Sequence, residues 1–251
     1  MDLGLADRVY LVTGGGRGLG RATADVLVAE GARVVLSGRS EDTLARAVEA
    51  LGDRATYVVG DNADAGTPGR LISTALGRWS RLDGALISVG GPPTGSVASV
   101  TDEQWTSSFA AVFLGAVRTA REVAAQLGTG GSIAFVLSTS VKGPLTEMAV
   151  SNGLRPGLAM VAKQLADELG PRGIRVNGLL PGRVGTERVA ELDALQDDPV
   201  AAKAGAVARV PLRRDGEPSE FGRAAAFLLS PAASFVSGAM LPVDGGVMRS
   251  L

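Results

Sequence analysis

The chain contains no cysteine and no histidine among its 251 residues. Without cysteine it can form no disulfide, no thiolate nucleophile and no thiolate metal site. Without histidine it lacks the commonest metal ligand and the usual general base. A Ser-His-Asp triad is therefore excluded, and with it the hydrolases that depend on one.

Aromatic residues are scarce at 4%, and the formal net charge is only −1, with no long basic run. This charge balance favours neither nucleic acid nor an anionic membrane as a partner. No apolar stretch reaches the length of a membrane span. The N-terminal sequence MDLGLADRVYLVTG begins acidic and runs directly into a strand, unlike a secretory signal. We therefore expect a cytoplasmic protein with a small-molecule substrate and with neither a nucleic-acid nor a membrane partner.

Glycine is abundant at 35 residues, and 45% hydrophobic with 20% charged residues is ordinary for a globular protein. Continuous apolar runs, typical of strands buried on both faces, alternate with helical patterns. This alternation predicts an α/β fold of one domain over residues 1–251, a Rossmann-like doubly wound, seven-stranded parallel sheet with helices on both faces. The expected strands cover 9–13, 33–38, 55–61, 84–90, 132–140, 174–182 and 239–246. The expected helices run through about Glu30 and over 40–51, 67–79, 102–127, 151–169 and 218–230.

Residues 183–210 interrupt this alternation. They are polar and alanine-rich, with Asp197, Asp198 and Pro199 in succession. Such a segment is typical of a loop that orders on binding. We interpret it as a mobile insertion that covers the substrate pocket.

The sequence TGGGRGLG, residues 13–20, lies between the first strand and the first helix. Glycines there let the backbone turn sharply and approach a ligand, and the helix N-terminus offers free N–H groups to a pyrophosphate. The strand–turn–helix context is the one that a dinucleotide-binding fingerprint requires. A plain tight turn is the alternative.

Several segments together resemble the short-chain dehydrogenase/reductase family of the classical type. They are the glycine-rich turn, GDNAD (60–64), GIRVNGLLPGRVGT (173–186) and FLLSPAASFVSGAMLPVDGG (227–246). The resemblance covers nearly the whole chain and implies a nicotinamide dinucleotide and hydride transfer on a carbonyl or alcohol. It implies these cofactor-binding residues: Gly14, Gly16, Arg17, Gly18, Leu19, Gly20, Arg39, Asp61, Asn62, Gly90, Arg155, Pro181, Gly182, Val184 and Thr186.

The end of the second strand indicates which dinucleotide is bound. An acidic residue there binds the ribose 2′-OH of NAD, whereas an arginine accepts the 2′-phosphate of NADP. This chain has Arg39 there and no carboxylate before Glu41, and Arg17 adds a second cation from the turn. We therefore predict NADP(H) as the cofactor, with two simple solvated charges as the alternative.

The family's active site contains a serine, a tyrosine and a lysine, and often an asparagine on the preceding long helix. Aligned on this chain, the serine falls on Ser138, the tyrosine on Ser151, the lysine on Arg155 and the asparagine on Val112. The sequence is thus identified as an atypical member that lacks the catalytic tyrosine and lysine. We predict Ser138, Ser151 and Arg155 as the catalytic residues.

A proton donor is not evident in this set. A serine hydroxyl is a weak acid, and arginine stays protonated. Lys142 or Glu147, or a water held by Ser138 and Ser151, could supply the proton, although loop charges are more often solvated. The other interpretation is that these residues form hydrogen bonds with one another and with a cofactor ribose, and take no part in catalysis.

Two functions therefore remain open. The first is an NADP(H)-dependent oxidoreductase with a non-standard active site. The second is a non-redox or catalytically silent member, such as a nucleotide-binding subunit, a cyclase or a dehydratase. By resemblance to the family we also expect a homotetramer or homodimer, formed through helices 102–127 and 151–169 and the C-terminal segment.

Overall fold

Seven short strands form one sheet in the computed structural model, which describes residues 2–250. All neighbouring strands are parallel, in the order β3-β2-β1-β4-β5-β6-β7. This arrangement confirms the predicted fold class. The strands are β1 Val9–Val12, β2 Arg33–Gly38, β3 Ala55–Val59, β4 Gly84–Ile87, β5 Ser132–Val136, β6 Arg175–Pro181 and β7 Met240–Val243.

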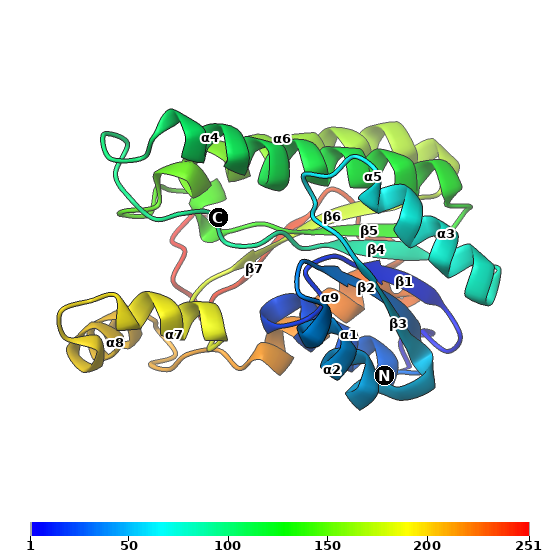
Figure 1. Cartoon of the computed structure of the whole chain (residues 1–251), viewed down its shortest axis with the longest axis horizontal. Coiled ribbons are helices and arrows are strands. Elements are labelled where there is room, and N and C mark those ends of the chain that lie inside the picture. Colours follow the sequence, from blue (N-terminus) through cyan, green and yellow to red (C-terminus); the bar gives the residue numbers. More distant parts are fainter. Residues whose placement is uncertain (1, 251) are drawn as a thin grey trace.

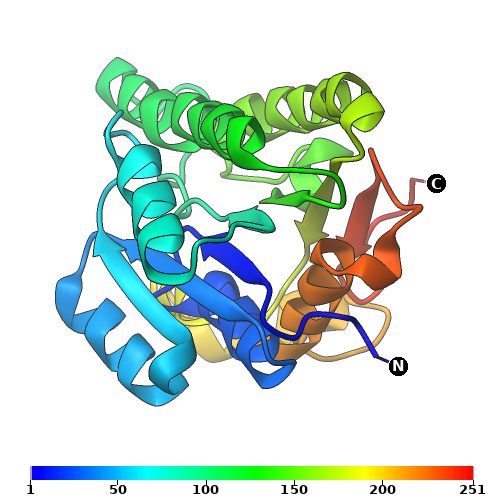
Figure 2. The same cartoon turned by 90° about the vertical axis from the view of Figure 1, so that its right-hand side faces the viewer.

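Helices cover both faces of the sheet (Figures 1 and 2). One layer holds α3 (Thr67–Trp79), α5 (Gly115–Gln126) and α6 (Ala149–Leu169), and its apolar side chains form one core cluster with the strands. The opposite layer holds α1 (Gly18–Ala29), α2 (Glu41–Leu51) and α9 (Pro218–Leu229), which form a second cluster. Two cores on a shared sheet bury the strands on both faces, which explains their continuous apolar sequence.

The helix starts follow from local capping. The Ser40 hydroxyl accepts a hydrogen bond from the Thr43 N–H at the start of α2. A capping box joins Thr101 and Gln104 at the start of α4 (Asp102–Ser108). Each cap satisfies N–H groups that the first helical turn leaves unpaired.

The single helix expected over 102–127 is divided. A π-helix, Phe109–Leu114, separates α4 from α5. The helix resumes at Gly115, where a methyl group would lie only 2.1 Å from the carbonyl oxygen of Asn62. Only glycine permits this close approach of the helix to the loop after β3.

The segment 183–210 contains two helices, α7 (Glu187–Ala194) and α8 (Pro199–Ala208), which the sequence pattern did not indicate. Figure 1 shows both, in yellow, apart from the two helix layers. Arg183 bonds to Asp193 on α7 at 2.5 Å and to Asp215 at 2.6 Å, and Asp198 caps α8. Mobility of the segment stays a prediction.

Within residues 2–250, no helix is both long and apolar enough to cross a membrane.

Candidate functional site

The ends of β1 and β4 are fastened together where the strand order reverses. Thr13 donates its hydroxyl to the Ser88 carbonyl at 2.6 Å and accepts a hydrogen bond from the Ser88 N–H at 2.9 Å. In an open parallel sheet, ligands bind in the crevice outside such a reversal of strand order. The glycine-rich turn follows Thr13 at this point.

Three glycines shape the turn. Gly14 and Gly18 adopt φ values of +60° and +58°, which side chains disfavour. A methyl group on Gly20 would lie 2.3 Å from the Gly14 carbonyl oxygen. Glycine is thus required at these positions for the turn to close tightly on α1.

The turn leaves the N-terminus of α1 without a side-chain cap. Arg17 occupies the N-cap position in an extended conformation and makes no capping hydrogen bond. The first N–H groups of α1 can therefore bind an anion, and the helix dipole favours one there. Leu19 is half-buried and packs on the core beneath α1. These features fit the pyrophosphate of a dinucleotide.

The structure places Thr186 opposite the turn and Gly90 at the edge of the crevice. A methyl group on Gly18 would lie 3.8 Å from Thr186 Cγ2, and one on Gly90 would meet nothing within 4 Å. Gly182 follows Pro181 at the end of β6 and approaches β7 so closely that a methyl group would lie 2.6 Å from Asp244 Cβ. Val184, two residues further, is buried.

Asp61 and Asn62 lie in the loop after β3, where the resemblance places adenine. Asp61 Oδ1 accepts the Ala63 N–H at 2.8 Å, so this carboxylate shapes its own loop. Asn62 Nδ2 donates to the Ser88 carbonyl at 3.4 Å, which joins the loop to the end of β4.

The two arginines predicted to bind a 2′-phosphate differ in their surroundings. Arg39 is exposed and has no ion pair within residues 2–250. Arg17 Nη1 lies 2.6 Å from Glu191 Oε1 on α7. The turn adjoins α2, because a methyl group on Gly16 would lie 3.0 Å from Thr43 Cγ2. Nothing in the sequence indicated the Glu191 contact, since 174 residues separate the partners.

Ser138 lies two residues beyond the end of β5 and is half-buried. Its hydroxyl oxygen accepts a hydrogen bond from the Ser140 N–H at 3.1 Å. This bond holds the short 3₁₀ turn Thr139–Val141 against the end of the strand.

Ser151 is only 3% exposed and faces Ser140. The two hydroxyl oxygens are 3.1 Å apart, and Ser140 Oγ also donates to the Ser151 carbonyl at 3.4 Å. Sequence reasoning missed Ser140. The signal was its place in the serine- and threonine-rich stretch that begins at Ser138.

Arg155 is 5% exposed, and its guanidinium turns toward the end of β5. Nη1 donates to the carbonyls of Val136 and, at 3.1 Å, Leu137, whereas Nε is buried without a partner within residues 2–250. Burial lowers the pKa of Arg155 to about 10, so the group keeps its charge at neutral pH. The side chain therefore joins α6 to the strand end that carries Ser138.

Asn152 does not share this cluster. Its Nδ2 donates to the Leu145 carbonyl at 2.8 Å, and its Oδ1 accepts the Leu145 N–H at 3.0 Å. The amide thus substitutes for a backbone partner and fixes the loop that leads into α6.

Both tyrosines of the chain lie in strands, and their hydroxyl groups bond to residues of α9 and α2. Tyr10 is buried and donates to the Leu229 carbonyl at 3.2 Å, and burial raises its pKa. Tyr57 donates to Glu41 at 3.3 Å, and its pKa is raised, first by burial and then by that carboxylate. Neither has Ser138 or Ser151 as a hydrogen-bond partner.

The aligned asparagine position and the two alternative proton donors named in the sequence analysis differ in exposure. Val112, on which the sequence alignment places the family's asparagine, is 4% exposed and packs in the core. Lys142 and Glu147 are both exposed, as solvated loop charges would be. Residues 2–250 contain no cluster of three or more carboxylates that could hold a metal ion.

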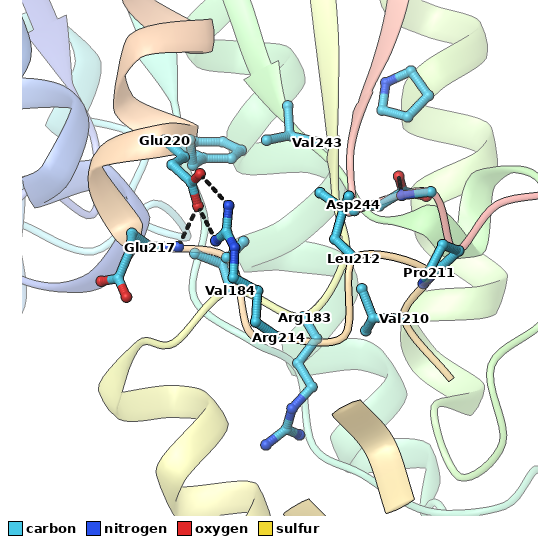
Figure 3. A pocket seen from close by; sticks show the side chains of 15 residues that line it. Arg183, Val184, Val210, Pro211, Leu212, Arg214, Glu217, Glu220, Val243 and Asp244 are labelled. Atoms are coloured by element: carbon cyan, nitrogen blue, oxygen red, sulfur yellow. Dashed lines mark hydrogen bonds and ion pairs between the residues drawn. The ribbon is translucent and has the colours of Figure 1, made fainter. Parts of the chain in front are cut away.

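A cavity of about 520 Å³ opens between the chain returning from α8 and the ends of β6 and β7 (Figure 3). Val184 and Phe221 contribute to its apolar lining. On its rim Arg214 binds Glu220 through two nitrogens, each at 2.6 Å. None of Ser138, Ser151 and Arg155 lines this cavity, so it is distinct from the predicted catalytic cluster.

Comparison with known proteins identifies the family of this chain. A family model described as enoyl-(acyl carrier protein) reductase matches residues 14–248. An uncharacterised oxidoreductase of Mycobacterium tuberculosis is 37% identical over 259 residues, covering 98% of this chain and 94% of the relative. The chain belongs to the short-chain dehydrogenase/reductase family. It is therefore a member of an oxidoreductase family with a Rossmann-like fold.

Two solved structures of this family are similar to the whole chain. L-sorbose reductase from Gluconobacter frateurii, complexed with NADPH and L-sorbose, has a TM-score of 0.91 and 28% identity, with all of both chains covered. A short-chain oxidoreductase from Pseudomonas aeruginosa PAO1, described as containing an atypical catalytic center, has the same score, identity and coverage. The family thus includes an NADPH-bound reductase and a protein with a non-standard centre.

Proposed function

We propose that the protein is an NADP(H)-dependent oxidoreductase acting on a carbonyl or alcohol group of a small molecule through a non-standard active site. The observation that carries the proposal is the uncapped N-terminus of α1 behind a turn that only glycines can form. The NADPH-bound relative and the exposed Arg39 support the phosphorylated dinucleotide. Pyrophosphate would bind at Gly18 and Leu19, and the nicotinamide end between Gly90 and Thr186.

When bound, the nicotinamide supplies or accepts the hydride. The half-buried Ser138 hydroxyl would bind the substrate oxygen. Arg155 would act electrostatically, because a buried cation stabilises negative charge that develops nearby. Ser151 occupies the family's tyrosine position, and in place of the missing phenol a water or a loop group would move the proton.

Two measurements test this proposal. Titration with NADPH, followed by its fluorescence, should show binding below millimolar concentration. A screen of carbonyl compounds should then show NADPH consumption, and Ser138→Ala and Arg155→Ala should each lower the rate by about tenfold or more, on the order of 1.4 kcal/mol. Ser107→Ala, an exposed serine-to-alanine change on α4, is the matched control and should leave the rate unchanged. Unchanged rates in the first two variants would reject these roles.

One observation favours a second candidate, a member that binds the dinucleotide without redox chemistry. The Ser151 hydroxyl and Arg155 Nη1 both have protein partners, Ser140 and the carbonyls at the end of β5. The double change Ser151→Tyr with Arg155→Lys distinguishes the candidates. New reductase activity in that variant, with none in the natural chain, would favour the silent form.

A further inference from the structure

Helix α7 presents two carboxylates to the glycine-rich turn. Glu187 and Glu191 are four residues apart, so they lie on one face of the helix. Glu191 Oε1 lies 2.6 Å from Arg17 Nη1. A methyl group on Gly18 would lie 3.9 Å from Glu187 Oε2. One carboxylate therefore faces the cation of the turn, and the other faces the start of α1.

These are the two places where the proposed function puts the phosphates of the cofactor. The N-terminus of α1 at Gly18 would bind the pyrophosphate, and Arg17 would share the 2′-phosphate with Arg39. Carboxylate and phosphate oxygens use the same donors, namely helix N–H groups and the arginine fork. A carboxylate placed there competes with a phosphate for the same site.

A second contact fixes α7 across the crevice. Arg188 Nη2 donates to the Pro92 carbonyl at 3.1 Å, in the loop that follows β4. Its Nη1 lies 3.7 Å from Glu191 Oε2. Glu191 is thus held between Arg17 and Arg188, and α7 is joined to the turn on one side and to the β4 loop on the other.

We propose that α7 is an internal competitor of the dinucleotide, with Glu191 in place of the 2′-phosphate and Glu187 in place of the pyrophosphate. The proposal rests on the proposed function. Binding of NADP(H) displaces Glu191 from Arg17 and releases α7 from the turn. Because NAD(H) has no 2′-phosphate, Glu191 weakens only the binding of NADP(H), whereas Glu187 weakens the binding of both dinucleotides.

Neutral variants test this assignment by equilibrium binding, which needs no substrate. Glu191→Gln should tighten NADPH binding about two- to fivefold, the range expected for an exposed ion pair, and leave NADH binding unchanged. Glu187→Gln should tighten both. Asp197→Asn is the matched control, because it removes one exposed charge from the same segment, and it should change neither. Without cofactor, amide hydrogen exchange over 187–194 should be faster in Glu191→Gln than in the natural chain.

The outcomes separate this inference from the proposed function. If NADPH binds all variants and the natural chain equally, or binds Glu191→Gln more weakly, the competitor role is wrong and the cofactor assignment stands. If neither the natural chain nor the double variant Glu187→Gln with Glu191→Gln binds either dinucleotide, both proposals fail. Binding by the double variant alone would support both.

Discussion

The glycine-rich turn and the segment after β5 use their polar groups in opposite ways. The turn leaves the first N–H groups of α1 without a cap, and Arg39 beside it is exposed. In the segment 138–155, by contrast, Ser151 bonds to Ser140, and Asn152 bonds to Leu145. At the turn a ligand meets unused N–H donors and has only the exposed ion pair of Arg17 with Glu191 to displace, whereas in the segment 138–155 it must break buried hydrogen bonds such as that of Ser140 with Ser151.

The largest effect should come from adding a side chain to the glycine-rich turn. In Gly20→Ala the new methyl group meets the Gly14 carbonyl at 2.3 Å, so backbone must move. We expect a loss of about 3 kcal/mol in the free energy of unfolding and loss of NADPH binding. Urea denaturation and fluorescence titration measure the two effects. Gly77→Ala in α3, where a methyl group meets nothing within 4 Å, is the control and should stabilise by about 0.5 kcal/mol. Equal stability of Gly20→Ala and the natural chain would contradict the close approach.

The next largest effect is expected in the segment 138–155, whose polar groups include the paired amide of Asn152. Asn152→Ala leaves both backbone groups of Leu145 without their side-chain partner. We expect the free energy of unfolding to fall by about 2 kcal/mol, with NADPH affinity unchanged because the amide faces its own loop. The same two measurements apply. A large loss of NADPH affinity at unchanged stability would show instead that Asn152 serves the ligand.

A smaller effect concerns the serine pair. Ser140→Ala removes the hydroxyl that faces Ser151 Oγ at 3.1 Å. We expect a loss of about 1 kcal/mol, because one buried hydroxyl is left without its partner. Thermal unfolding provides the readout, with Ser107→Ala as the exposed control. If Ser140→Ala destabilises no more than the control, the pair is not a structural bond.

The smallest effect lies outside both regions, at Glu220 on the rim of the cavity. Hydrogen bonds from Arg214, and then from the Glu217 N–H, lower the pKa of Glu220 from 4.5 to about 2. A lowered folded-state pKa contributes stability above pH 4.5, and that contribution is lost as the pH falls from 4.5 to about 2. The unfolding free energy should therefore fall less steeply over this window in Glu220→Gln. Urea denaturation between pH 2 and 6 measures the slope, and parallel profiles would contradict the shift.

Local sequence patterns were sufficient to predict the strands of the sheet and the position of the glycine-rich turn. Residues 33–38 and 67–79 were predicted with the bounds of β2 and α3, because the apolar run of a buried strand and a proline in the first turn of a helix are signals carried by neighbours in sequence. The helix expected over 102–127 was wrong in its middle, where a π-helix intervenes. The two helices of 183–210 were missed, although Asp198 as N-cap and Pro199 in the first turn are local signals for the start of α8. The ion pair of Arg183 with Asp215 joins residues far apart in sequence, so spacing could not indicate it.

For the candidate site, the sequence placed Ser138 inside a strand expected over 132–140, whereas β5 ends at Val136 and Ser138 lies beyond it. The sequence also shows that no tyrosine lies beyond Tyr57. It could not show that the Arg155 guanidinium is bonded to carbonyls of β5, or that Glu191 faces Arg17. Side-chain direction depends on which acceptors the folded backbone leaves within reach, and spacing along the chain does not contain that information.

By itself the sequence determined the strand–turn–helix that contains the glycine-rich turn, because glycine's freedom at φ > 0 and the apolar period of strands act over a few residues. Tertiary structure alone decided which polar groups remain free for a ligand. That outcome depends on contacts such as Ser140 with Ser151 and Arg17 with Glu191, which exist only once β5, α6, α7 and the turn have packed together.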